Sequence, residues 1–203
     1  MTIHIEKEKL EKFNNFVNDN NLFDEYKDID GRNKWNIICS CMDWIDTAIT
    51  YIESFEEFNN NPHISSMQIY SLLSAADMIS ESINQLHRVL LPSSALPFKS
   101  HKEIFKSKLD AFENQDDNSY FKELRAIFGA HPTNLTPNKE LNELGNRYAS
   151  FPKKHTYTNN FSITLYSNEL EKGDVEITLN FNEVINFLTT RYSYLDTLLD
   201  RLK

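Results

Sequence analysis

The chain of 203 residues is long enough to bury one sizeable core and does not require two domains; its 40% hydrophobic and 25% charged residues are ordinary for a globular protein. Its net charge of −9 argues against a general nucleic-acid coat protein and against a protein of the membrane surface. The N-terminal residues lack the apolar run of a signal peptide, and no apolar run is long enough to span a membrane. We therefore expect a single domain, residues 1–203, in the cytoplasm and without membrane contact.

The first predicted elements are helices. Residues 4–19 place apolar side chains roughly on one face, and after a polar connection residues 33–59 repeat apolar side chains every three or four positions. Residues 64–91 repeat the same pattern, and the sequences NNNPH and LPSSALP end these two long segments. The stripes predict a pair of long helices that supplies most of the core.

The two cysteines, Cys39 and Cys41, lie in the first long helical segment. Residues two apart on a helix point about 200° apart, which is too divergent for a disulfide or a shared metal. We expect both to be reduced core or boundary residues, as is typical of a cytosolic protein.

Shorter elements follow. Residues 99–113 and 117–129 are predicted to be helical, with Asp117 or Ser119 as the cap of the second, and residues 130–160 read as an irregular region. Alternating apolar and polar residues in two runs predict a β-hairpin over 161–181. Asn182 is then expected to cap a last helix, 183–202. The predicted fold class is mainly α: a helical bundle, with its core in 33–150 and 183–202, that carries one β-hairpin before the C-terminal helix.

One stretch offers chemistry: FKELRAIFGAHPTNL, residues 121–135. Gly129 is expected to be a left-handed residue at the end of a helix, and Pro132 forbids the helix to continue. In an unbroken helix Arg125 and His131 would point about 240° apart, so the break could bring them to the same side. The pair then has two interpretations. Arg125 stabilises the helix end while His131 binds a local carbonyl, or the two surround a phosphodiester as phosphate ligand and general base.

The charge of this region is consistent with the second interpretation and also with chance. Residues 121–155 carry six Lys or Arg against three Glu, a local charge of +3 that leaves −12 for the rest of the chain. His155 follows Lys153 and Lys154 in this window, where it either extends a phosphate site or is a simple loop residue. No cysteine, histidine or carboxylate spacing indicates a metal site and no nucleotide-binding motif occurs, so we expect neither metal nor cofactor.

The run R-A-I-F-G-A-H, in a chain rich in helices, resembles the R-x(4–6)-H signature of HEPN domains over about residues 33–150. That superfamily consists of small helical proteins that are usually homodimers. Many are metal-independent endoribonucleases of toxin–antitoxin, abortive-infection and CRISPR systems. The resemblance implies that Arg125 and His131 are the catalytic pair and act across a dimer cleft with a second copy.

The resemblance is to a variant branch. Ala126 stands where active members commonly place Asn, Asp or His, and Thr133 stands where toxins silenced by a nucleotidyltransferase carry tyrosine. Thr133 and Asn134 either donate to a phosphate in place of the missing polar group or form a local turn after the proline. Together with Lys122 they are the candidate phosphate-binding residues.

Three hypotheses follow. The chain is an HEPN-like, metal-independent endoribonuclease of a toxin or defence system, or a non-catalytic dimeric binding or scaffold module of the same fold. Otherwise it is an unrelated helical protein in which Arg125 and His131 serve only the local fold. The expected partners are a second copy of the chain, RNA, and an antitoxin or other defence protein.

Overall fold

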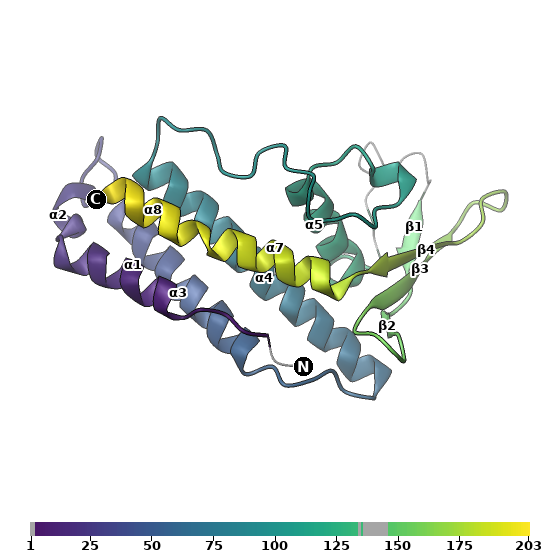
Figure 1. The fold of residues 1–203 in the computed structure, drawn as a ribbon. Coiled ribbons are helices and arrows are strands. Elements are labelled where there is room, and N and C mark those ends of the chain that lie inside the picture. The colour runs from purple at the N-terminus through teal and green to yellow at the C-terminus, as the bar shows by residue number, and fades with distance from the viewer. Residues whose placement is uncertain (1–2, 134, 136–145) are drawn as a thin grey trace. The chain divides into compact units, whose positions relative to one another are not determined.

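The computed structural model describes residues 3–133, 135 and 146–203 (Figure 1). The chain divides into two compact units. The first unit comprises Met1–Glu57, Ala75–Lys99 and Phe187–Lys203, and the second comprises Phe58–Ser74 and Ser100–Asn186. Two helices, α4 (Pro62–Leu90) and α7 (Phe181–Tyr192), contribute residues to both units.

The first unit is built from helices alone. It contains α1 (Glu8–Asp19), α2 (Leu22–Tyr26), α3 (Trp35–Glu53), the later turns of α4, the end of α7, and α8 (Tyr194–Leu202). Their apolar stripes meet in a core of aliphatic and aromatic side chains, because a helix with one apolar face must bury it against another element. The largest fully buried apolar side chains of this unit are Phe13, Ile38, Ile45, Ile49, Phe187 and Tyr192.

The N-terminal segment is tied to the C-terminal helices by one tyrosine. The Tyr192 hydroxyl donates to the carbonyl oxygen of Glu6 at 2.9 Å and accepts from the backbone N–H of Leu10 at 3.1 Å. Burial raises the pKa of Tyr192 to about 12, so the hydroxyl keeps its proton and its donor role at every physiological pH.

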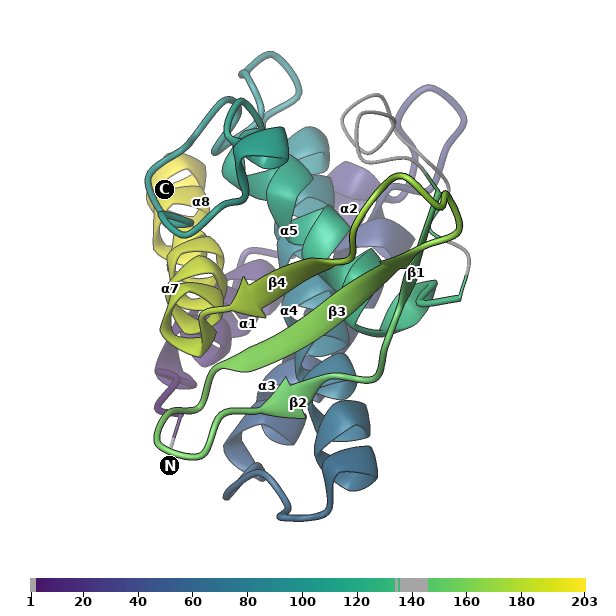
Figure 2. The same ribbon diagram turned by 90° about the vertical axis from the view of Figure 1, so that its right-hand side faces the viewer.

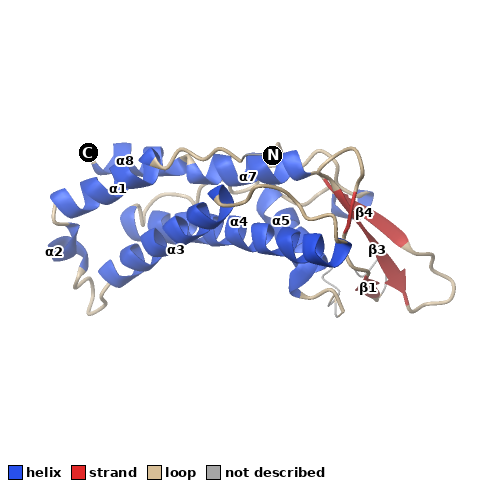
Figure 3. Cartoon of the chain, turned by 90° about the horizontal axis from the view of Figure 1, so that it is seen from below, coloured by secondary structure: helices blue, strands red, loops and turns tan. Residues whose placement is uncertain are grey.

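The second unit combines helices with a sheet. The first turns of α4, the 3₁₀ turn Asp110–Phe112, α5 (Asp117–Arg125) and the start of α7 accompany four strands: β1 (Arg147–Ala149), β2 (Lys153–Lys154), β3 (Phe161–Ser167) and β4 (Val175–Leu179). All pairings are antiparallel, and β3 is central, with β4 along one edge and both β1 and β2 along the other (Figure 2). The four strands belong to this unit. Strands are drawn red in Figure 3.

The edge strand of this sheet is interrupted by a β-bulge. Ala149 of β1 pairs with Leu165, and Lys153 of β2 pairs with Ser162, so four steps along the edge oppose three along β3. The extra residue falls in 150–152, where Pro152 has no N–H to give to the ladder. Thr164 instead donates its backbone N–H to the Ser150 hydroxyl at 3.0 Å. The bulge turns Phe151 outward, with 43% of its surface exposed.

A buried carboxylate holds the loop before α5. Asp117, fully buried, accepts the backbone N–H groups of Glu103 (3.0 Å), Ile104 (3.1 Å) and Phe105 (3.3 Å). The Lys108 ammonium, itself nearly buried, lies 3.7 Å from the same carboxylate. Three donors and one cation compensate the desolvation of the charge, so the side chain fixes the irregular segment 101–108 against the first turn of α5.

The expected mainly α class is wrong. The structure is 54% helical with a four-stranded antiparallel sheet, which makes it an α+β fold. The hairpin strands within 161–181 and the long helix over 64–91 are confirmed. The sequence did not predict β1 and β2, because strands of three and two residues are too short to show an alternation of apolar and polar side chains. Two other expectations differ: 99–113 holds only a 3₁₀ turn, and 183–202 is two helices that meet at Ser193.

None of the helices in the described ranges is long and apolar enough to cross a membrane.

Two neighbouring aspartates provide a matched test of the buried carboxylate. Asp117→Ala should lower the free energy of unfolding by about 3–5 kcal/mol, because it strands three N–H groups and leaves the nearly buried Lys108 without its counter-charge. Asp116→Ala removes only a helix cap and should cost about 1 kcal/mol. Urea titration followed by circular dichroism measures both, and equal losses would contradict the anchoring role of Asp117.

Candidate functional site

Helix α5 carries the first half of the Arg–His motif. Its N-cap is Asp116, whose carboxylate accepts the Ser119 N–H at 2.9 Å. The prediction that Asp117 or Ser119 caps the helix is therefore wrong, and the Asp117 side chain is buried instead. Lys122 is exposed and Arg125 half-buried, and residues three apart lie on neighbouring positions of one helix face.

The helix is kinked at Gly129, whose backbone angles are not helical, and the turn around it is wider than an α-turn. Residues Ala126–Ala130 form a single π-turn, closed by the His131 N–H, which donates to the Ala126 carbonyl oxygen at 3.0 Å. Gly129 has φ 172° and ψ −34°, so the left-handed conformation expected from its position is wrong. Arg125 and His131 therefore stand at the two ends of one wide turn, and the predicted break at Gly129 is present inside it as a kink.

Glycine is required at position 129 for a steric reason. A Cβ atom there would come within 2.3 Å of Cδ2, 2.6 Å of Cγ and 2.8 Å of Cβ of Tyr70 on α4. The Cβ of Tyr70 is fixed to the helix backbone, so rotating the ring cannot relieve the contact. The missing side chain thus lets the π-turn lie directly against α4.

The predicted site residues differ in their exposure and in whether they line a cavity. His131 and Thr133 are exposed, Lys122 is exposed on α5, and Arg125 is half-buried. Asn134 lies outside the described residues. Thr133 lines a cavity described below, whereas Arg125, His131 and Lys122 are not among its described lining residues.

An apolar cavity of about 320 Å³ adjoins the motif. Its walls are one face of α4, the end of the π-turn with the residues after it, and the bulged edge strand. Met67 and Phe151, 61% and 43% exposed, stand at its mouth. Sequence reasoning missed this cavity, because the bulge that closes it has no local signature. The lining residues are Ser66, Met67, Tyr70, Phe128, Gly129, Pro132, Thr133, Ala149, Ser150, Phe151 and Pro152.

A second, basic cavity of about 290 Å³ lies at the start of α4. Lys153, Lys154 and His155 of the edge strand form one wall, and the first turn of α4 with the preceding asparagines forms the other. The Lys153 ammonium lies 5.9 Å from the Phe151 ring centroid and the Lys154 ammonium 5.8 Å from that of Phe58. His155, one residue after β2 ends, is half-buried and lines the same wall.

The basic residues of the window 121–155 differ in burial. Arg147 is buried, and its guanidinium donates to the carbonyl oxygens of Gly173 (2.7 Å) and Leu165 (3.4 Å), so it serves the sheet. Lys139 lies outside the described residues. Lys122 and Lys153 are exposed, and Arg125 and Lys154 half-buried, on the motif helix and on the edge strand.

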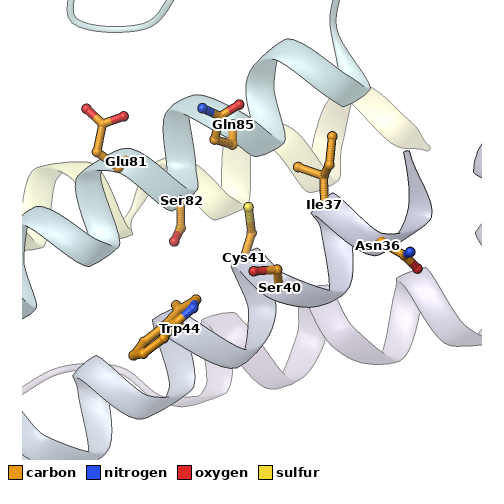
Figure 4. A pocket seen from close by; sticks show the side chains of 8 residues that line it. All are labelled: Asn36, Ile37, Ser40, Cys41, Trp44, Glu81, Ser82 and Gln85. Atoms are coloured by element: carbon orange, nitrogen blue, oxygen red, sulfur yellow. The ribbon is translucent and has the colours of Figure 1, made fainter. Parts of the chain in front are cut away.

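The first unit has a cavity of its own, about 340 Å³, between α3 and α4 (Figure 4). Trp44, 49% exposed, and the buried Cys41 line it. Burial raises the pKa of the Cys41 thiol to about 11, so at neutral pH this sulfur is a protonated, weakly nucleophilic group. Both cysteines are free thiols, and the cavity offers no reactive pair. Its lining residues are Asn36, Ile37, Ser40, Cys41, Trp44, Glu81, Ser82 and Gln85.

Comparison of the chain with protein-family models, with curated protein sequences and with solved structures gives no match. The arrangement around the motif is therefore interpreted from its own geometry.

The contact between Gly129 and Tyr70 makes a stability prediction. Gly129→Ala should destabilise the protein by about 1–3 kcal/mol, because α4 or the π-turn must move to accept the methyl group. Gly173→Ala is the matched control, since an added Cβ there meets no atom within 4 Å. Thermal unfolding monitored by calorimetry measures both, and a Gly129→Ala protein as stable as Gly173→Ala would refute the close approach.

Proposed function

We propose that the protein binds a ribonucleic-acid phosphodiester at the end of α5 and cleaves it without a metal ion, in the manner of HEPN-like endoribonucleases. The observation that carries this proposal is the single π-turn whose five residues separate Arg125 from His131. Single π-turns inside α-helices occur frequently at functional sites, and this one, kinked at Gly129 where the helix ends, sets where the side chains that flank it emerge. Its coincidence with the motif favours a functional pair over two unconnected residues.

The chemistry follows from the two side chains. The exposed His131 imidazole takes the proton of a ribose 2′-hydroxyl as general base. The 2′-oxygen then bonds to phosphorus and the 5′-oxygen leaves, so the products end in a 2′,3′-cyclic phosphate and a 5′-hydroxyl. The Arg125 guanidinium binds the non-bridging oxygens in a fork and stabilises the charge that develops on them, and Lys122 adds a cation on the same helix. A second copy of the motif in a homodimer would return the proton to the leaving oxygen.

Cleavage of a labelled RNA in EDTA tests the proposal. His131→Ala should reduce the rate by about 10² to 10⁴ through loss of the general base, and Arg125→Ala by a comparable factor through loss of charge stabilisation. His4→Ala and Arg88→Ala remove an exposed histidine and an exposed helix-end arginine elsewhere and should change nothing. Products lacking a cyclic phosphate, or His131→Ala activity equal to wild type, would refute the mechanism.

The same proposal requires a homodimer, because two copies of the motif are needed to surround one phosphodiester. Sedimentation velocity at micromolar concentration should therefore give about twice the mass of the 23.8 kDa chain. A protein that stays monomeric at high micromolar concentration would leave the motif without its second half.

A second candidate function is a binding module without cleavage, in a host-defence or regulatory system. Ala126, the first residue of the π-turn, favours it, because a methyl group stands beside Arg125 where a polar neighbour would serve catalysis. Ala126→Asn separates the two candidates. A gain in cleavage identifies Ala126 as the attenuating residue of an enzyme, while RNA binding without cleavage in both proteins supports the binding module.

A further inference from the structure

We propose that the bulged edge strand, residues 149–156, and the first turns of α4 form a nucleotide subsite beside the motif. The base of a single-stranded RNA enters the apolar cavity against Phe151, and a phosphate of the same strand enters the basic cavity at Lys153 and Lys154. This inference rests on the proposed RNA function and specifies which part of the RNA the protein holds.

The two cavities are neighbours along the same two elements. Pro152 lines the apolar cavity and Lys153 the basic one, while on α4 Ser66 lines the first and Ser65 the second. The Ser66 hydroxyl oxygen lies 2.9 Å from the Pro152 carbonyl oxygen and 2.6 Å from the Pro62 carbonyl oxygen, where the strand meets the helix, and its one proton is shared between these two acceptors. A strand of RNA therefore passes from one cavity to the next without leaving the wall.

The apolar cavity suits a planar ring. Its volume of about 320 Å³ lies at the small end of the range for ligand pockets, and Tyr70 and Phe128 form part of its lining. Phe151 exposes 43% of its surface at the mouth, where a stacked base would remove it from water. Thr133, a predicted phosphate ligand, belongs to the same lining, so the cavity continues directly from the motif.

The basic cavity suits a phosphate. Lys153, Lys154 and His155 line it, and the described residues of its wall include no carboxylate. Within the part of the chain that the structure describes, neither lysine forms an ion pair, so both ammonium groups are available to an anion. Their contacts with the rings of Phe151 and Phe58 hold them in place.

Aromatic and basic residues in alternation are the usual means of binding single-stranded nucleic acid, in which the bases are free to leave the stack. A duplex keeps its bases paired and cannot fill the apolar cavity. The subsite therefore predicts a preference for single strands over duplex RNA.

The test measures binding without cleavage. A short, fluorescein-labelled 2′-O-methyl oligonucleotide lacks the attacking hydroxyl, so fluorescence anisotropy reports affinity alone. Phe151→Ala should weaken binding of the single strand by roughly 10- to 100-fold, and Phe151→Leu, which keeps the apolar bulk but not the ring face, should also weaken it. Lys153→Ala with Lys154→Ala should weaken it and lower the slope of affinity against salt by about two charges.

Controls come from the same unit. Tyr157, 97% exposed on the same segment, lines neither cavity, so Tyr157→Ala should bind like wild type. Lys102→Ala with Lys106→Ala removes two exposed lysines from another segment and should leave affinity nearly unchanged. A duplex of the same sequence should bind more weakly than the single strand.

The outcomes separate this inference from the proposed cleavage. Binding of the single strand that depends on Phe151 and on the two lysines, without cleavage of ordinary RNA, supports the subsite and overturns the proposed enzyme. Cleavage with wild-type affinity in the Phe151 and lysine variants overturns the subsite and leaves the enzyme standing. Binding of the duplex as tightly as the single strand, or no binding of either, also overturns the subsite.

Discussion

The arrangement of the second unit depends on one steric constraint, the contact between Gly129 and Tyr70. An added Cβ at position 129 would lie 2.3 Å from the ring of Tyr70, so only glycine lets the end of the α5 segment meet α4. That approach fixes the π-turn, and the turn in turn sets where His131, Pro132 and Thr133 emerge. The sequence suggests that position 129 needs glycine in order to adopt a left-handed backbone conformation. The structure shows an extended φ there instead, so glycine is needed because a side chain would clash with Tyr70.

The bulge in the edge strand is the second determinant of the candidate site. In an antiparallel strand without an extra residue, the side chains of 150–152 would continue to alternate between the two faces of the sheet. The one-residue mismatch between β1 and β2 against β3 breaks that alternation and exposes Phe151 beside α4. The same interruption separates an apolar cavity from a basic one, since Pro152 belongs to the first and Lys153 to the second.

Charge in this unit serves two different ends. Some charged side chains are buried and stabilise the fold. Asp117 binds backbone N–H groups and the nearly buried Lys108, and the buried Arg147 binds a backbone carbonyl oxygen. The exposed or half-buried basic residues of the window 121–155 that the structure describes, Lys122, Arg125, Lys153 and Lys154, lie on α5 and on the edge strand. An acidic chain with a net charge of −9 can therefore hold a local site for an anion, because the screening length in salt is short compared with the size of the protein.

The sequence by itself determined the long helix over 62–90, the hairpin of β3 and β4, and the Arg125–His131 spacing, because these depend on periodicity or on residues close in the chain. It did not determine the fold class, since β1 and β2 exist only through hydrogen bonds to the edge of β3. It also could not specify the π-turn or the two cavities. The π-turn and the cavities depend on contacts of α4 with the end of α5 or with the bulged strand. Such contacts join residues far apart in the chain, so they produce no periodic pattern in the sequence of any one segment.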